Sequence, residues 1–310
     1  METERIHRAT SDDGTVIAGR VYGEGPPLVL LHGAMADGLI EWGELVPHLT
    51  DRFTCYLPDM RNRGLSGQHP DVSRAARLRD AVAYVESIDQ PVAVLGASGG
   101  GMLALGVTAR SDRIVATAAH EPVVFEAMDP TARGEYGELI DEVTGLAERG
   151  DHLRVAEIFF DWVANDDEMA AFGDDAAALE DVARYVPMDV AEFQEAFRGE
   201  GESPTAPELL ATIDVPVLTL TGTQTGHPWF TASVRFAAEH IPTATVRELD
   251  GLGHLAHMFD PEQVATEVVG FLERAVAPAE DRLGRRLVAP SGHPSSLAGL
   301  WQGLGTRITS

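Results

Sequence analysis

Short apolar segments alternate with segments of helical periodicity along most of this chain, and this alternation restricts the fold more than any other feature. Most of the apolar segments have the length of a buried strand and are followed by apolar residues three to four positions apart. This order predicts a mostly parallel sheet with helices on both faces, an α/β fold. The expected strands are 28–31, 53–57, 92–95, 114–119, 215–220 and 245–249, preceded by a hairpin around residues 12–14.

The strand signals disappear in the middle of the chain. There, Val155, Ile158 and Trp162 recur at the spacing of an amphipathic helix. We therefore expect a helical lid inserted into the domain, and a final segment rich in Gly, Pro and Ser that is irregular. The expected division is an α/β core at 1–124 and 208–277, a helical lid at 125–207 and a tail at 278–310.

The charge and cysteine content exclude several function classes. The formal net charge of -26 argues against nucleic acid or an anionic membrane surface as a partner. The chain has a single cysteine and no lysine, so it can form neither a cysteine metal cluster nor a lysine Schiff base. We expect a cytoplasmic protein that acts on a small molecule, with no metal and no cofactor. The sequence leaves the oligomeric state open, a homo-oligomer included.

A Gly-x-Ser-x-Gly motif lies where an expected strand becomes a helix. It is Gly96-Ala97-Ser98-Gly99-Gly100, and its glycines fit a sharp turn that lifts the serine hydroxyl above the end of the sheet. A serine needs a base to accept its proton. Gly253-His254 follows the last expected strand, which makes His254 the candidate base and Ser98 the candidate nucleophile.

With these motifs in this order, the chain resembles the α/β-hydrolase fold enzymes over residues 4–277. Residues 30–34 (LLHGA) are similar to the oxyanion loop of that family, and residues 58–67 (PDMRNRGLSG) are similar to its Asp-Met-Arg-Gly-x-Gly-x-Ser turn. The resemblance implies the α/β-hydrolase fold, which is a mostly parallel eight-stranded sheet flanked by helices, with a helical lid inserted between the sixth and seventh core strands. A serine at position 98 excludes the aspartate nucleophile found in some relatives.

The oxyanion hole is expected to consist of two backbone N–H groups. They belong to Gly99, directly after the nucleophile, and to Ala34. Met35 is the alternative donor if the loop register is shifted by one residue.

The acid of the triad is missing from its commonest place. In most relatives it follows the seventh strand, where this sequence has Thr225. Three interpretations are open. The favoured one is Glu121, at the end of the strand next to the nucleophile strand. Asp250 is the second. The third is a serine–histidine dyad without an acid, or a protein that has lost hydrolysis.

These residues predict a serine hydrolase that forms an acyl-enzyme on Ser98. An apolar pocket under an acidic lid favours a neutral, medium-sized ester, thioester or lactone. A carbon–carbon bond hydrolase with the same machinery, or a non-hydrolytic ligand-binding or biosynthetic protein on this scaffold, is the alternative. The expected substrate-binding residues are Met35, Phe125, Trp162, Trp229 and Met258.

Overall fold

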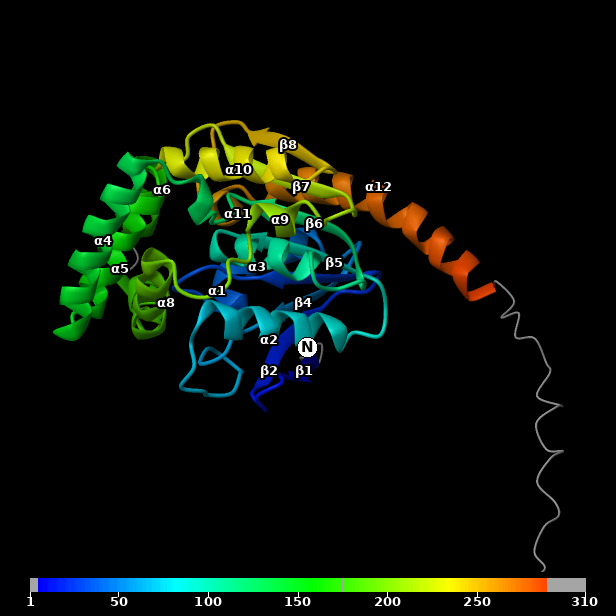
Figure 1. The fold of residues 1–310 in the computed structure, drawn as a ribbon, viewed down its shortest axis with the longest axis horizontal. Coiled ribbons are helices and arrows are strands. Elements are labelled where there is room, and N and C mark those ends of the chain that lie inside the picture. Colours follow the sequence, from blue (N-terminus) through cyan, green and yellow to red (C-terminus); the bar gives the residue numbers. More distant parts are fainter. Residues whose placement is uncertain (1–4, 174–175, 289–310) are drawn as a thin grey trace, which may run out of the picture.

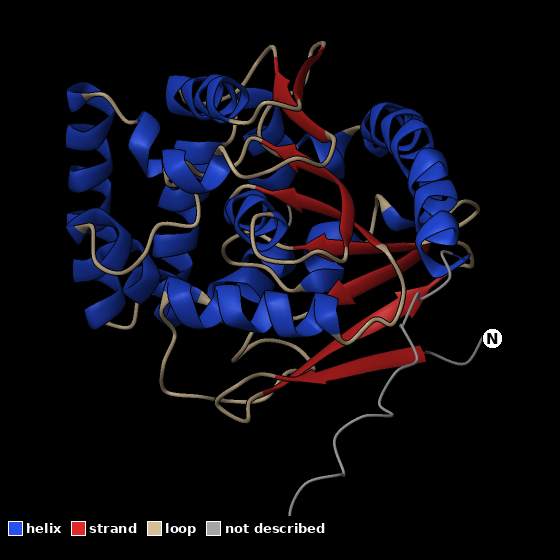
Figure 2. Cartoon of the chain, turned by 45° about the vertical axis from the view of Figure 1, so that its right-hand side comes forward, coloured by secondary structure: helices blue, strands red, loops and turns tan. Residues whose placement is uncertain are grey.

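The computed structural model describes residues 5–173 and 176–288 of the chain, and its centre is an eight-stranded sheet. The strand order is β1-β2-β4-β3-β5-β6-β7-β8; β2 runs antiparallel to both of its neighbours, and all other pairs are parallel. Figure 2 shows this twisted sheet between its layers of helices. The strands are β1 (Arg5–Thr10), β2 (Val16–Tyr22), β3 (Pro27–Leu31), β4 (Thr54–Pro58), β5 (Val92–Ala97), β6 (Ile114–His120), β7 (Val217–Gly222) and β8 (Ala244–Leu249).

The sheet is apolar on both faces because helices cover both. In β3, Leu28 and Leu30 pack on one face, whereas Val29 and Leu31 pack on the other. Helix α12 (Pro261–Val288) covers the first face together with the α1 (Gly38–Trp42) and η1 (Val46–His48) region. Helices α2 (Arg74–Glu86), α3 (Gly99–Thr108) and α10 (Pro228–His240) pack on the other face.

Between β6 and β7 the described residues form helices and loops and no strand. The helices are η2 (Phe125–Ala127), α4 (Pro130–Glu148), α5 (His152–Val163), α6 (Asp166–Gly173), α7 (Ala176–Ala183), α8 (Val186–Arg198) and α9 (Pro207–Leu210). The group from α4 to α8 stands at the side of the sheet where the parallel strands end, as Figure 1 shows, whereas α9 lies against α3 and α10. We call α4 to α8 the helical insertion. The division of the chain into a core and a lid stays a prediction.

Helix α12 departs from the expectation for the end of the chain. The segment 278–310 was expected to be irregular, but α12 continues to Val288 and extends past the body of the molecule in Figure 1. Its sequence after Pro278 is AEDRLGRRLV, which is rich in helix formers, and this local propensity outweighs the proline that precedes it. Residues 289–310 lie outside the described residues.

Candidate active site

The candidate nucleophile, Ser98, occupies a strained turn between β5 and α3. Its φ of 54° and ψ of -124° are outside the regions that L-residues normally adopt. The turn also presses the chain against the sheet, since a Cβ at Gly100 would lie 2.0 Å from the carbonyl oxygen of Leu31. Glycine is therefore required two residues after the serine, as the motif predicts.

His254 and Glu121 are hydrogen-bonded to each other, although 133 residues separate them in the sequence. The distance from His254 Nδ1 to Glu121 Oε2 is 2.8 Å, and both side chains are buried. A carboxylate only accepts hydrogen bonds, so Nδ1 carries the proton and Nε2 keeps a free lone pair. His254 also stacks on Phe230 with ring centroids 3.9 Å apart, which fixes the plane of the imidazole.

Glu121 follows β6 with a φ of 39°, and four donors surround its carboxylate. Oε1 accepts from the Thr221 hydroxyl and the Gly222 N–H, and Oε2 accepts from His254 and the Thr225 hydroxyl. Burial by itself raises the pKa of Glu121, but the hydrogen bond from His254 and the nearby imidazoles outweigh it and lower the pKa to about 2.

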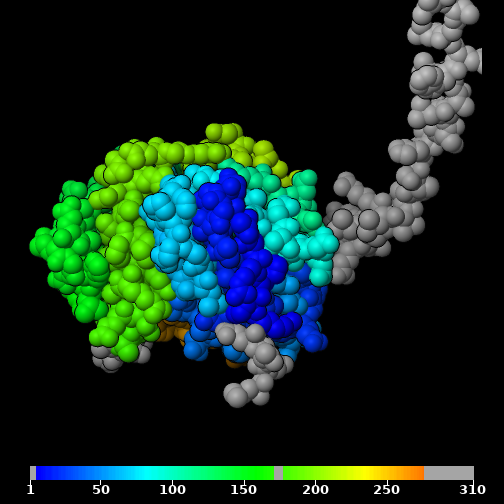
Figure 3. Space-filling model, turned by 90° about the horizontal axis from the view of Figure 1, so that it is seen from below, coloured from blue at the N-terminus to red at the C-terminus, as the bar shows by residue number. Residues whose placement is uncertain are grey.

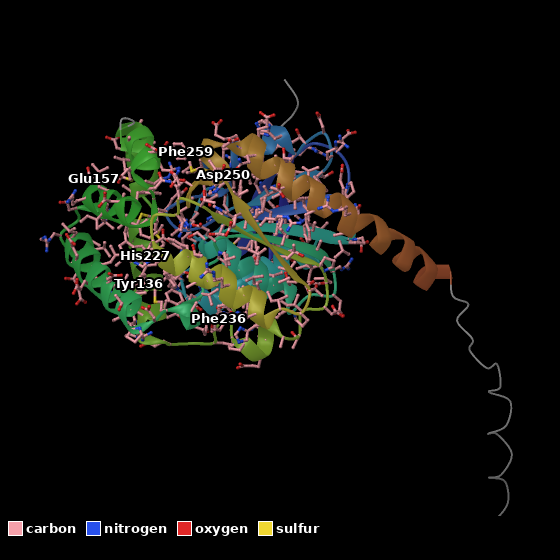
Figure 4. All side chains as sticks on the ribbon, turned by 90° about the horizontal axis from the view of Figure 1, so that it is seen from above. Tyr136, Glu157, His227, Phe236, Asp250 and Phe259 are labelled. Atoms are coloured by element: carbon pink, nitrogen blue, oxygen red, sulfur yellow. The ribbon has the colours of Figure 1, made fainter. Side chains whose placement is uncertain are left out.

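This hydrogen bond favours Glu121 over the other two interpretations of the acid, which are Asp250 and a dyad without an acid. Asp250, labelled in Figure 4, is exposed after β8, and the residue that His254 contacts is Glu121. Thr225 lies in the position of the usual acid and donates to Glu121 Oε2 at 2.9 Å. The threonine therefore supports the carboxylate that the preceding strand provides.

The loop after β3 brings Ala34 next to Gly99. A Cβ on Gly99 would lie 3.9 Å from the Ala34 nitrogen, so the two backbone segments face each other beside Ser98. The N–H of Gly99 belongs to the first turn of α3, where backbone donors have no intrahelical acceptor. The N–H of Met35 instead donates to Asp189 Oδ2 at 2.7 Å. The geometry thus favours Ala34 over Met35 as the second oxyanion donor.

A buried carboxylate of the helical insertion holds the loop after β3, the candidate oxyanion loop. Asp189, on α8, accepts from Met35, whose φ is 51°, and forms an ion pair with Arg63. Arg63 in turn donates to the carbonyl oxygen of Ala36 at 2.9 Å. The positive φ of Met35 is therefore stabilised from both sides of the turn.

A second carboxylate of the insertion, Glu168 on α6, holds the histidine loop. Its Oε1 accepts from the N–H of Leu255 at 2.9 Å, and its Oε2 accepts from the N–H of Asn165 at 3.1 Å. Burial raises the pKa of Glu168, and these two hydrogen bonds oppose the increase. The insertion thus contacts both loops that flank Ser98.

Two cavities adjoin Ser98, of about 470 and 510 Å³. The first contains His254 and a polar corner, where Glu41 Oε1 lies 3.2 Å from His257 Nε2. The second, which we call the aromatic cavity, has seven aromatic residues among its lining, from η2, the insertion and α10. The structure brings all five expected substrate-binding residues to these cavities: Met35 and Met258 to the first, and Phe125, Trp162 and Trp229 to the second.

Sequence reasoning missed several polar residues of the site: Glu41, Arg77, Glu168, Asp189 and Glu192. Each lies on a helix where a charged residue is ordinarily a solvated one, and no local motif marks it. The available signal was weak: His257 is adjacent to Met258, an expected substrate-binding residue, and it lines the first cavity.

Two searches of the described part of the chain concern metal ligands and membrane-spanning helices. Within residues 5–173 and 176–288, no three His, Cys, Asp or Glu side chains are grouped so that they could hold a metal ion. None of the helices in these ranges combines the length and the apolar character that a membrane span requires.

Comparisons with known proteins agree with this fold. The chain is 23% identical over 269 residues to the pyrrolizixenacetamide deacetylase of Xenorhabdus hominickii, covering 81% of this chain and 92% of that protein. It superposes on an α/β hydrolase from Sphaerobacter thermophilus with a TM-score of 0.67 and 26% identity, over 86% of this chain and 100% of the other. An esterase from Rhodococcus sp. gives a TM-score of 0.67 and 23% identity over 87% of this chain and 99% of its own. Residues 28–267 match the model of the alpha/beta hydrolase family, and the chain belongs to that family.

Proposed function

We propose that this enzyme, an α/β hydrolase of the esterase type, cleaves a neutral, medium-sized carboxylic ester, thioester or lactone through an acyl-enzyme on Ser98. The observation that carries the proposal is the 2.8 Å hydrogen bond between His254 Nδ1 and Glu121, which leaves Nε2 as a base in the cavity that also contains Ser98. Esterases among the structural neighbours, and the deacetylase relative, support hydrolysis of an acyl group.

In the proposed reaction, His254 Nε2 accepts the proton of Ser98 as the hydroxyl oxygen attacks the substrate carbonyl. The tetrahedral oxyanion accepts hydrogen bonds from the N–H groups of Gly99 and Ala34, each worth about 3 kcal/mol in comparable sites. The protonated His254 is stabilised by the Glu121 carboxylate and returns its proton to the leaving alcohol or thiol. A water molecule, deprotonated by His254, then releases the acid and restores Ser98.

The preference for a neutral substrate rests on the charges around the cavities. The first cavity contains the Glu41 carboxylate, which is only 8% exposed, and the aromatic cavity contains an ion pair of no net charge. An anionic acyl group would have to be desolvated beside a buried carboxylate, which is unfavourable.

Turnover of p-nitrophenyl butyrate by the wild type and by Ser98→Ala tests the proposal. We expect turnover by the wild type and a decrease of at least about 10³-fold in Ser98→Ala, since the residual rate comes from binding and the oxyanion hole alone. Folded wild-type protein that cleaves neither this ester, nor the butyryl thioester, nor a lactone would contradict it.

A further inference from the structure

The aromatic cavity contains one buried cation that the proposed chemistry does not use. Arg77, on α2, lines this cavity together with Ser98 and is only 4% exposed. Its ion pair with Glu192 on α8 places it where the helical insertion meets the core. Figure 3 shows the green insertion beside a light-blue segment of the core. Among the described lining residues of the cavity, Arg77 and Glu192 carry the charged side chains, and most of the others are aromatic or aliphatic, so the guanidinium is the strongest hydrogen-bond donor among these side chains.

The donors of Arg77 are only partly satisfied. One terminal nitrogen, Nη1, pairs with Oε2 of Glu192, a residue of α8 that is 7% exposed. Within the described residues, Nε and Nη2 have no hydrogen-bond partner. Buried donors without an acceptor are costly, and such groups in native proteins usually have a ligand or water to bind.

The charges near Arg77 restrict which acceptor can bind. Glu192 already neutralises the guanidinium. Three further carboxylates act on it. Asp80 and Asp189 are paired with Arg61 and Arg63, and Glu195 accepts from the N–H of Arg74. An anion in the cavity would therefore meet donors without a net positive charge, and it would approach the Glu192 carboxylate. A neutral oxygen gains the hydrogen bonds without this repulsion.

We propose that Arg77 is a substrate-binding residue that donates hydrogen bonds to an uncharged carbonyl or hydroxyl oxygen on the part of the substrate that occupies the aromatic cavity. This inference rests on the proposed function for the role of Ser98. The inference restricts the expected substrate to an ester whose aromatic or apolar part carries a neutral oxygen acceptor at a distance from the scissile bond.

Three small ligands of similar shape test the inference. Acetophenone presents a carbonyl oxygen, α-methylstyrene replaces this oxygen by a methylene group, and benzoate carries a negative charge. Their dissociation constants are measured by calorimetry on Ser98→Ala, and their inhibition constants on the wild type against p-nitrophenyl butyrate. We expect acetophenone to bind about tenfold more tightly than α-methylstyrene, which corresponds to about 1.4 kcal/mol. We expect benzoate to bind more weakly than acetophenone.

Two variants separate ligand binding from a purely structural link between α2 and α8. The double variant Arg77→Met/Glu192→Gln removes both charges and leaves no buried ion unpaired. It should reduce the preference for acetophenone over α-methylstyrene to less than about twofold. Glu192→Gln alone leaves the guanidinium unneutralised, and it should raise the affinity for benzoate relative to acetophenone by about tenfold or more. A structural link would change the affinities of all three ligands together and leave their ratios unchanged. Circular dichroism checks that each variant is folded.

The outcomes for the two proposals are distinguishable. If the wild type and Ser98→Ala bind acetophenone and α-methylstyrene equally, or if the double variant keeps the preference, the inference about Arg77 is wrong whatever the turnover. If the preference is present and depends on Arg77 but the wild type cleaves no ester, thioester or lactone, the proposed function is wrong and the binding site stands.

Discussion

Replacing Glu121 by glutamine tests how the site keeps His254 in the state of a base. In the native site every neighbour of the carboxylate donates: Thr221 and Gly222 to Oε1, Thr225 and His254 to Oε2. A glutamine has one oxygen and one NH₂ group, so the NH₂ must face either the Gly222 N–H or the ring of His254.

The second orientation costs less, because the two neighbours differ in what they can change. The backbone N–H of Gly222 is always a donor, and leaving it buried without an acceptor costs about 1–3 kcal/mol. The imidazole can instead move its proton from Nδ1 to Nε2 and accept from the glutamine. In that tautomer Nε2 has no lone pair for the Ser98 proton. We therefore expect kcat to fall by about 10³- to 10⁴-fold, or about 4–5.5 kcal/mol of transition-state stabilisation.

Steady-state hydrolysis of p-nitrophenyl butyrate measures this effect. Thr225→Val is the matched control, because it removes one donor to Glu121 Oε2 and leaves the carboxylate and the tautomer of His254 in place. Its loss of kcat should stay below about tenfold. If Glu121→Gln retains turnover within about threefold of the wild type, the tautomer argument is refuted and Glu121 is not the acid of the triad.

Three further predictions concern the surroundings of the site. Asp189→Ala removes the acceptor that holds the candidate oxyanion loop and leaves the buried Arg63 unpaired. It should lower the free energy of unfolding, measured in urea, by about 3–5 kcal/mol, and it should also reduce kcat. An unchanged kcat would show that Asp189 does not act on the loop. Burial, with repulsion from nearby arginines at His32, lowers the pKa of His32 and His120 from 6.5 to about 3. Between these two pH values the unfolded chain binds more protons than the folded one. The free energy of unfolding should therefore be intact above pH 6.5 and decline towards pH 3 by up to about 1.4 kcal/mol per pH unit for each histidine. A free energy of unfolding from urea denaturation that does not change over this pH range would contradict the lowered pKa values. Gly100→Ala places a Cβ 2.0 Å from a backbone oxygen of β3 and should abolish turnover or folding. Gly134→Ala lies on the open surface of α4, and in thermal unfolding it should stabilise the protein by up to about 1 kcal/mol.

The strands and the strained serine turn were predictable because their signals are local. An apolar run of strand length followed by glycines needs no knowledge of the rest of the chain. Even there, β5 reaches Ala97, two residues past its expected end at 95, because Gly96 and Ala97 still pair with β6. The local pattern identifies Gly96 as a breaker, but pairing with the neighbouring strand outweighs it.

Glu121 was a different kind of prediction. Its position follows from the resemblance and the strand order that it implies, since β6 lies between the nucleophile strand β5 and β7, after which the acid of most relatives comes. The positive φ of Glu121 and the support from Thr225 could not be derived, because both depend on how the ends of β6 and β7 meet.

The polar contacts between the helical insertion and the core could not be predicted at all. Asp189 and Arg63 are 126 residues apart, and neither belongs to a pattern that pairs them. The same holds for Arg77 and Glu192, whose meeting depends on how α8 packs against α2. Such contacts are determined by tertiary packing, and a surface charge on an amphipathic helix has the same sequence pattern as a buried one.

The proposed function depends most directly on Ser98 being an activated nucleophile. The intact mass of the protein after exposure to a fluorophosphonate measures this property directly, on the wild type, Ser98→Ala and Glu121→Gln. We expect one phosphonyl adduct on the wild type, none on Ser98→Ala, and formation at least about 10²-fold slower on Glu121→Gln. A folded wild-type protein without an adduct, or an adduct that persists in Ser98→Ala, would contradict the proposed function.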